Sequence, residues 1–295
     1  MTSDTRDDIE LSVVIPAHNE AAVITHQLDA LAAQSWDGSW DVIVVDNCST
    51  DDTAAIVAAY SQTHPQFRVV PASARKGLNY ARNAGIAAST GRSFALVDAD
   101  DIVSPGWLTA MGSALRDHEL VTGPLELDRL NPPALAGSRG RRDEQDAPSF
   151  CGIFESAHGN NIGVRRAAYN RIGAFDEDPR LLGCEDMEFS MRAWIDGIVL
   201  FFATGAVVHY RYRTDPRVLW QQGRRYGKSR PMLVRKLRAA GRPRPSRFAG
   251  WRSWVWLVVH LPDLRISERR AAWVWVAGNR LGQLEGSIRY RCLFI

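Results

Sequence analysis

The sequence lacks several patterns that would assign it quickly to a class of protein. Its four cysteines are scattered and form no C-x-x-C pair, so they predict free thiols in a reducing cytoplasm and not a disulfide framework. Residues 1–10 are acidic and polar, so we expect no secretory signal there. The apolar run Trp254–Leu261 has eight residues, far fewer than the ~20 that span a bilayer. We therefore expect a cytoplasmic protein without a membrane-spanning helix.

Glycine-rich nucleotide-binding motifs are also missing. No Gly-x-Gly-x-x-Gly follows the first expected strand, and the sequence contains no Gly-x-x-x-x-Gly-Lys-Ser/Thr. These absences argue against a dinucleotide-dependent dehydrogenase and against a P-loop ATPase. No RNA-binding or DNA-binding motif accompanies the basic residues, so we do not expect nucleic acid as a partner.

Charge is divided unevenly along the chain. Residues 206–295 hold 20 of the 36 lysines and arginines but only four of the 33 acids, whereas residues 1–205 carry 16 basic and 29 acidic side chains. A basic tail on an acidic body is typical of a segment that meets something anionic. Phospholipid, nucleic acid and the acidic body itself all fit the charge of this tail.

The first hundred residues alternate between buried-strand and helix patterns. The expected elements are, in order, strand 11–16, helix 21–33, strand 41–46, helix 53–60, strand 67–70, helix 76–89 and strand 94–97. This order predicts an α/β fold with a parallel, doubly wound sheet. Right-handed crossovers bring the strand ends at Pro16, Asp46 and Asp98 to one rim. We expect the ligand at that rim, where open α/β sheets bind theirs.

Three carboxylates follow the fourth strand, namely Asp98, Asp100 and Asp101. In a regular strand, Asp98 and Asp100 would share one face because they are two residues apart. Converging carboxylates repel one another unless a cation lies between them, and their oxygens suit Mg²⁺ or Mn²⁺. The alternative is a polar turn in which Asp101 or Ser104 caps the next helix. Asp46 has two similar options, a helix cap or an acceptor for a base or ribose.

The second half of the chain carries another acidic pair. Residues 126–149 are polar and predict a long loop, and a helix is expected at 165–172. A further helix begins at Glu185-Asp186, where the helix dipole favours carboxylates in the first turn. The helix dipole alone would explain one of these two acids. The alternative is that the pair faces a site, where one of them acts as a general base.

Five segments, in this order, resemble the family 2 glycosyltransferases of the GT-A fold over roughly residues 11–210. They are Ser12–Glu20, Val45–Asp51, Ala81–Gly85, Asp98–Asp101 and Glu185-Asp186. The resemblance implies a mostly parallel, Rossmann-like sheet and a catalytic domain at 1–210, which leaves 211–295 as a basic helical extension. It also implies inverting, metal-dependent transfer of a sugar from a nucleotide diphosphate sugar to a hydroxyl of a glycan, glycolipid or metabolite. UDP is the first expectation for the donor nucleotide, with GDP and dTDP behind it.

The resemblance also implies roles for individual residues. The implied nucleotide-sugar-binding residues are Pro16, His18, Glu20, Asp46, Lys76, Gly77, Arg82, Asn83, Asp98 and Ala99. The implied ligands of a divalent ion, Mn²⁺ or Mg²⁺, are Asp98, Asp100 and His209. Asp186 is the implied catalytic base, with Glu185 beside it. From its sequence position alone, His209 is either a structural residue at a strand end or a ligand.

Two other classes of protein remain as alternatives. A sugar nucleotidyltransferase of similar fold needs a glycine-rich loop with Arg and Lys after the first strand, and the loop here is Ala17–Glu20. A non-catalytic nucleotide-sugar-binding or membrane-scaffold relative would have a broken acid set, whereas Asp98, Asp100 and Asp186 are all present.

The basic tail predicts helices beyond the resemblance. A helix is expected at 216–240, and its residues 221–228 could close over the donor diphosphate because Arg and Lys bind phosphate well. Tryptophans then alternate with arginines at Trp251, Trp254, Trp256, Trp273 and Trp275. Such a pattern favours peripheral attachment to an anionic membrane, at the inner face of the plasma membrane. The alternative is that these tryptophans pack on the body.

Overall fold

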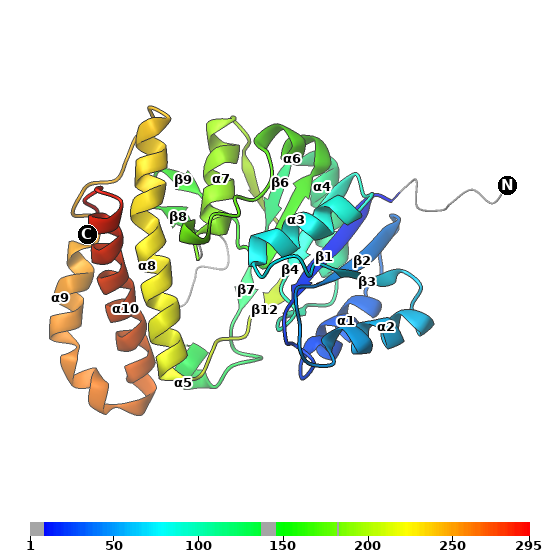
Figure 1. The fold of residues 1–295 in the computed structure, drawn as a ribbon, viewed down its shortest axis with the longest axis horizontal. Helices are drawn as coiled ribbons and strands as arrows, with labels where there is room; N and C mark the ends of the chain where they lie inside the picture. Colours follow the sequence, from blue (N-terminus) through cyan, green and yellow to red (C-terminus); the bar gives the residue numbers. More distant parts are fainter. Residues whose placement is uncertain (1–8, 137–145, 182) are drawn as a thin grey trace.

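The computed structural model describes residues 9–136, 146–181 and 183–295. At its centre lies a seven-stranded sheet in the order β11-β6-β10-β4-β1-β2-β3 (Figure 1). Its strands are β1 (Leu11–Ala17), β2 (Trp40–Asp46), β3 (Phe67–Pro71), β4 (Ser93–Val97), β6 (Leu120–Thr122), β10 (Asn161–Arg165) and β11 (Leu200–Phe202). Only β10 runs against its neighbours in this sheet, so the predicted α/β fold with a mostly parallel sheet is confirmed.

Two small sheets and the helices complete the fold. The remaining strands are β5 (Ile102–Val103), β7 (Leu125–Glu126) and β12 (Val208–His209) in one sheet, and β8 (Ser149–Phe150) and β9 (Phe154–Glu155) in another. The α-helices are α1 (Ile24–Ala32), α2 (Thr53–Thr63), α3 (Leu78–Ala88), α4 (Trp107–Asp117), α5 (Pro133–Ala136), α6 (Arg166–Ile172), α7 (Glu185–Ile195), α8 (Pro216–Ala239), α9 (Trp251–Val259) and α10 (Ser267–Arg289). Two 3₁₀ turns are η2 (Pro179–Leu181) and η3 (Leu261–Arg265).

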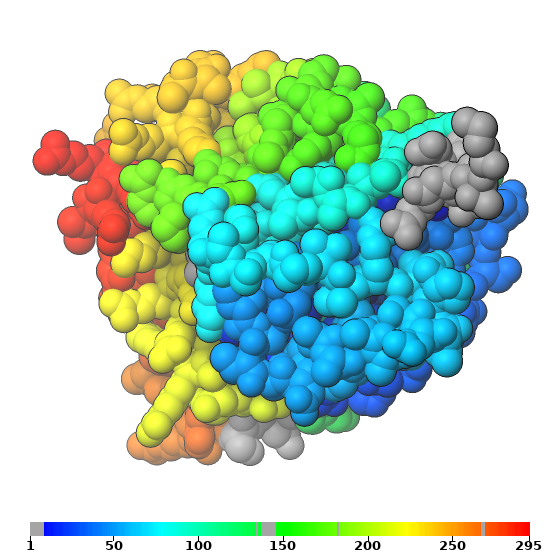
Figure 2. Space-filling view, turned by 45° about the vertical axis from the view of Figure 1, so that its right-hand side comes forward, coloured from blue at the N-terminus to red at the C-terminus, as the bar shows by residue number. Residues whose placement is uncertain are grey.

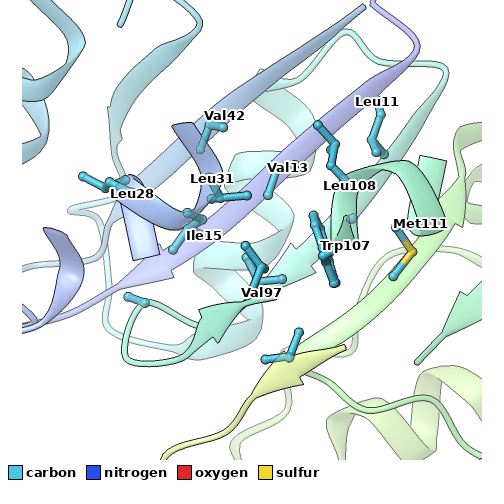
Figure 3. Close-up of a cluster of buried hydrophobic side chains, with 14 of the residues drawn as sticks. Leu11, Val13, Ile15, Leu28, Leu31, Val42, Val97, Trp107, Leu108 and Met111 are labelled. Atoms are coloured by element: carbon cyan, nitrogen blue, oxygen red, sulfur yellow. The ribbon is translucent and has the colours of Figure 1, made fainter. Parts of the chain in front are cut away.

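β1 and β4 are buried along their whole length, and β2 is buried at all but its two end residues, because helices cover both faces of the sheet. Alternate residues of β1 point to opposite faces. Val13 and Ile15 pack with Leu28 of α1 and Trp107 of α4 (Figure 3), whereas Val14 packs on the α3 side. This two-sided burial holds the carboxyl ends of β1, β2 and β4 in fixed relative positions.

Register brings the expected strand ends together. Ala17 pairs with Asp46, and Asp46 pairs with Pro71 on the other side. The predicted rim of strand ends is therefore confirmed. The predicted strand end at Val97 is confirmed, and Asp98 and Asp100 follow it in a turn, so their positions do not come from alternation along a strand. The β10 strand at 161–165 was not predicted, and the expected loop at 126–149 contains α5 and the start of β8, with residues 137–145 outside the described part.

The carboxyl-terminal extension is helical, as predicted, with α8 beside α10. The two helices run parallel, because Gly223 of α8 lies against Trp275 and Gly227 lies against Asn279 one turn further along α10. Figure 2 shows the orange and red segments at one edge of the molecule, with α8 in yellow between them and the blue and cyan half. Among the described residues, no helix is both long enough and apolar enough to cross a membrane. The domain boundary at 210/211 stays a prediction.

Candidate active site

Two loops at the sheet rim hold each other through side-chain hydrogen bonds. The Thr50 amide donates to Asn19 Oδ1 at 2.7 Å, and the Ala21 amide donates to Asp51 Oδ2 at 3.1 Å. Asn19 and Cys48 both adopt left-handed backbone with φ of 58° and 59°, a conformation that non-glycine residues rarely adopt and that clusters at functional sites. These contacts fix the loop that carries His18 and Glu20.

Asn47 ties the end of β2 to the loop before α3. Its amide nitrogen donates to the carbonyls of Ala72 at 2.6 Å and Arg75 at 2.8 Å, and its oxygen accepts from the Gly77 amide at 2.8 Å. Asn47 is 5% exposed, so this network is protected from water. Asn47 is not among the predicted site residues, and its partners lie 25 to 30 residues away from it in the sequence.

His18 and Lys76 meet across the rim. The His18 Nδ1 lies 2.8 Å from the Asn47 carbonyl, and its Nε2 lies 3.0 Å from the Lys76 ammonium. A carbonyl only accepts and an ammonium only donates, so Nδ1 carries the proton and the ring is neutral in this arrangement. The pair leaves the lysine charge at the mouth of the cleft.

A cleft of about 300 Å³ lies at this rim. It is lined by Pro16, Ala17, His18, Glu20, Asn47, Lys76, Gly77, Leu78, Ala81, Asp98, Ala99, Asp100 and Arg213. Seven of the ten residues predicted to bind the nucleotide sugar line it, and Asp46, Arg82 and Asn83 do not. One carboxylate oxygen of Asp46 is buried and has no hydrogen-bond partner in the part of the chain that the structure describes. The side-chain amide of Asn83 holds the turn at Phe175.

The acidic cluster faces this cleft with two of its three members. Oxygens of Asp98, Asp100 and Asp101 lie within 4.8 Å of one another. Asp101 is buried and already accepts from Asn160 Nδ2 at 2.6 Å and from the Arg211 amide at 2.9 Å. It therefore holds the chain after β12 and does not cap α4, whose N-cap is Gly106.

Charges around the cluster are only partly balanced. Arg213 pairs with Asp100 at 3.0 Å, and Arg82 lies 3.7 Å from Asp98. Burial raises the pKa of Asp98 to about 6 against the pull of Arg82, with Asp100 adding to the rise. Burial and Asp100 likewise raise the pKa of Glu20 to about 7. Crowded carboxylates of this kind suit a hard divalent cation, whose charge would relieve the repulsion.

Arg82 also connects the cluster to Asp186. Its guanidinium is 3% exposed and donates to the Gly159 carbonyl at 2.8 Å, and the Gly159 amide donates to Asp186 Oδ2 at 3.2 Å. A Cβ on Gly159 would lie 3.1 Å from the Arg82 Nη2 and 3.3 Å from the Asp186 Cβ, so only glycine fits this bridge easily. Although Arg82 does not line the cleft, it orders both acidic groups.

Glu185 is buried at the start of α7. Its Oε2 accepts from the Gly183 amide at 2.7 Å, and its Oε1 has no hydrogen-bond partner among the described residues. Burial raises the pKa of Glu185 to about 7, with Asp186 adding to the rise and Arg82 opposing it. The two acids therefore differ, because Asp186 accepts a hydrogen bond from the Gly159 amide whereas Glu185 is buried and accepts one from the Gly183 amide.

His209 lies apart from the acidic cluster in the described part of the chain. Its Nδ1 is 2.6 Å from Glu126 Oε2, and its Nε2 is 3.0 Å from Arg129 Nη1. The group of acids that could hold a metal contains Asp98, Asp100 and Asp101 and not this histidine. The structure therefore does not bring His209 to the cluster, and its assignment as a metal ligand stays a prediction.

Two further cavities adjoin the cleft and share walls with it. Leu78 lines all three cavities, and Glu185 lines both of the neighbours. One neighbour, of about 280 Å³, lies between Gly183 and the first turns of α8, where Arg213, Gln221 and Arg225 line it. The other, of about 480 Å³, is bounded by residues 75–80 and 176–179. The site is thus a cleft with two adjoining cavities.

Comparison with known proteins identifies the family. Residues 12–172 match the model of Glycosyl transferase family 2, and residues 94–278 match that of Glycosyl transferase family group 2. The succinoglycan biosynthesis protein ExoO of Rhizobium meliloti (strain 1021) is 38% identical over 174 residues, which cover 55% of this chain and 48% of that protein. The chain therefore spans about half the length of this curated relative.

Two solved structures share the fold. A mannosyltransferase from Pyrobaculum calidifontis, in complex with GDP-Man and Mn²⁺, matches with a TM-score of 0.60 and 20% identity over 91% of this chain and 73% of that one. S. aureus TarS 1–349, in complex with UDP-GlcNAc, matches with a TM-score of 0.54 and 18% identity over 96% of this chain and 93% of that one. At these identities the likeness concerns the fold alone.

The chain belongs to glycosyl transferase family 2 and has the GT-A-like fold. Membership of this family implies sugar transfer with inversion at the anomeric carbon.

Proposed function

We propose that this chain is a metal-dependent glycosyltransferase that uses a nucleoside diphosphate sugar bound in the rim cleft and delivers the sugar to an acceptor hydroxyl activated by Asp186. The observation that carries the proposal is the chain of contacts from Asp98 through Arg82 and Gly159 to Asp186. These contacts join the carboxylates of the rim cleft to Asp186, the residue that the family motif assigns as base. The groups proposed to bind the donor and the group proposed to take the proton are therefore held by one set of contacts.

Asp186 is the proposed general base. Its oxygens accept from the Gly159 and Met187 amides, and these hydrogen bonds orient the carboxylate. A carboxylate held in this way can take the proton of an acceptor hydroxyl that attacks the anomeric carbon opposite the leaving group. A single displacement of this type inverts the configuration and needs no covalent carboxylate intermediate.

Asp98 and Asp100 are the proposed ligands of Mn²⁺ or Mg²⁺. Their oxygens face the cleft, whereas both oxygens of Asp101 are already engaged. The ion, when bound, supplies Lewis-acid neutralisation of the departing diphosphate. Arg213, which pairs with Asp100 and lines the same cleft, would add a second positive charge beside it.

UDP is the proposed donor nucleotide, ahead of GDP and dTDP. His18, Lys76 and Asn47 surround the space where a base and ribose would lie. Structural neighbours were solved with UDP-GlcNAc or with GDP-Man and Mn²⁺, which supports nucleotide sugars as a class without choosing between the bases. The acceptor is proposed to be a carbohydrate, a lipid-linked sugar or a small molecule.

We also propose that the protein works in the cytoplasm, peripherally at the inner face of the plasma membrane. Residues 206–295 hold 20 basic and four acidic side chains, and this positive charge supports the location because anionic lipid attracts such a segment.

A thermal-shift panel of UDP, GDP, dTDP and CMP, each with Mn²⁺ and with EDTA, tests the donor proposal. Ligand binding raises apparent stability by RT ln(1 + [L]/Kd), so one nucleoside diphosphate should raise the Tm only when Mn²⁺ is present. Asp100→Ala should remove the manganese-dependent part of the shift. An equal shift with EDTA would contradict the metal role, and no shift with any nucleotide would contradict the donor site.

A further inference from the structure

The extension exposes apolar side chains where a surface helix normally carries polar ones. Of the 13 large apolar residues exposed in the described part of the chain, seven lie within the 19 residues 248–266. Trp251, Val255, Val258 and Val259 of α9 are among them, and Val258 is 76% exposed. These positions recur at helical spacing and form one stripe along α9, which points away from the described body.

The inner side of α9 shows that its orientation is fixed. Leu257 is buried, and its carbonyl accepts from the Trp273 indole of α10 at 3.0 Å. At the start of the helix, the Gly250 amide donates to the Ile295 carbonyl at 2.9 Å. The helix is therefore docked on α10 by one side, and its apolar stripe is what remains outside.

Gly223, Gly227, Gly282 and Gly286 lie where α8 and α10 meet, and we call this contact the glycine seam. It makes the α8–α10 pair that supports α9 rigid. The carbonyl of Arg224 lies where a Cβ on Gly282 would be, and Lys228 approaches Gly286 in the same way one turn later. Backbones in such close contact do not slide easily. In Figure 1, α9 lies outside this pair, on the side away from the central sheet, and no residue of α9 lines the rim cleft.

The surroundings of the stripe are positive. Residues 240–266 contain five exposed arginines, Arg242, Arg244, Arg247, Arg252 and Arg265. Asp263 is the acid in this segment, and it is 9% exposed and lies 3.6 Å from Arg269. An isologous contact with a second copy would bring arginines against arginines, which is unfavourable.

We propose that the α9 surface, defined as the exposed apolar residues of 248–266 with their flanking arginines, docks on an anionic phospholipid membrane. Tryptophan and aliphatic side chains enter the boundary between headgroups and acyl chains, and the arginines bind lipid phosphates. The helix lies in the plane of the interface, because nine residues are too few to span it. This inference names the surface behind the proposed membrane contact and requires no donor, metal or turnover.

Vesicle co-sedimentation of the full chain tests the inference. Vesicles of phosphatidylcholine with about 30 mol% phosphatidylglycerol should bind the protein at least about 10-fold more tightly than pure phosphatidylcholine, and ~0.5 M salt should weaken that binding. The variant Trp251→Ser/Val255→Ser/Val258→Ser should lose binding by at least about 10-fold. Arg244→Gln/Arg247→Gln/Arg252→Gln should bind anionic vesicles no better than neutral ones.

The matched control is Val199→Ser, which changes another exposed apolar residue far from α9 in the sequence and should bind like the original protein. Brominated lipids should quench tryptophan fluorescence of the original protein more than that of the α9 variant. Thermal shifts with nucleotide are measured for every variant, and unchanged shifts show that the fold and the donor site are intact. A loss of vesicle binding with unchanged shifts is therefore distinguishable from a failure of the proposed function. Equal binding to neutral and anionic vesicles, unchanged binding by the α9 variant, or a dimer that the α9 substitutions dissociate would overturn the inference.

Discussion

Asn47 holds three backbone groups and lines the cleft, whereas Asn83 holds the turn at Phe175 and does not line it. The family motif pointed to Asn83 and gave no role to Asn47. A motif states which positions recur, but the partners of Asn47 lie 25 to 30 residues further along the chain. Its role therefore depends on how the loop at 72–77 folds back, which local sequence does not encode.

Replacing Asn47 tests whether this clamp shapes the donor cleft. Asn47→Ala removes three hydrogen bonds, each worth about 1 kcal/mol, and releases the Lys76-Gly77 loop. We expect the Kd for the preferred nucleoside diphosphate to rise about 10-fold in calorimetry. The control Asn83→Ala should lower the Tm while its nucleotide Kd stays within about twofold. Unchanged affinity in Asn47→Ala would refute the clamp.

The raised pKa of Glu185 can be tested through the pH dependence of stability. Its pKa is raised from 4.5 to about 7 by burial, so the folded protein binds this proton more tightly than the unfolded chain does. The free energy of unfolding therefore falls as the pH rises from about 5 to about 8, by up to about 3 kcal/mol from this group. Glu185→Gln should lack that part of the fall in urea titrations at several pH values. Parallel curves for the two proteins would show that Glu185 ionises normally.

At the level of elements, the first hundred residues were the most predictable. β1, β2 and β4 there each centre on a run of consecutive apolar residues, so local pattern and tertiary position agree. β10 was missed because Asn161 and Gly163 interrupt its apolar pattern. Asn161 Oδ1 accepts a hydrogen bond from the Trp107 indole at 3.0 Å, and the missing side chain of Gly163 leaves room for Met111. The convergence of Asp98 and Asp100 was expected, but a turn produces it and not a strand.

The glycine seam of the extension was also missed, because glycines inside a helix lower its intrinsic propensity. Their value appears only when two helices meet. Gly282→Ala places a Cβ 1.9 Å from the Arg224 carbonyl and must separate α8 from α10. We expect a loss of about 1–3 kcal/mol in urea unfolding. Leu281→Ala, one residue away and partly exposed, should change stability by less than about 0.5 kcal/mol. Equal effects of the two substitutions would count against the seam.

For the whole molecule, composition predicted an acidic body with a basic tail, and the structure explains part of that division. Arg213 from the start of the tail pairs with Asp100, and Lys236 of α8 bonds with Asp176 at 2.8 Å. The tail thus contributes Arg213 to the wall of the rim cleft and is joined to the body by these two ion pairs. Charge counts could not show this, since they do not say which basic residues face the body and which face outward.

In the proposed mechanism Asp186 takes the proton of the acceptor hydroxyl and does not contribute to donor binding. The most direct test compares Asp186→Asn with the original protein in two assays, release of nucleoside diphosphate from the donor sugar and calorimetric affinity for that nucleotide with Mn²⁺. Asn keeps the size of the side chain but cannot take a proton, so we expect turnover to fall at least about 100-fold while the nucleotide Kd changes less than about twofold. Turnover that survives the substitution would contradict the assignment of Asp186 as the base.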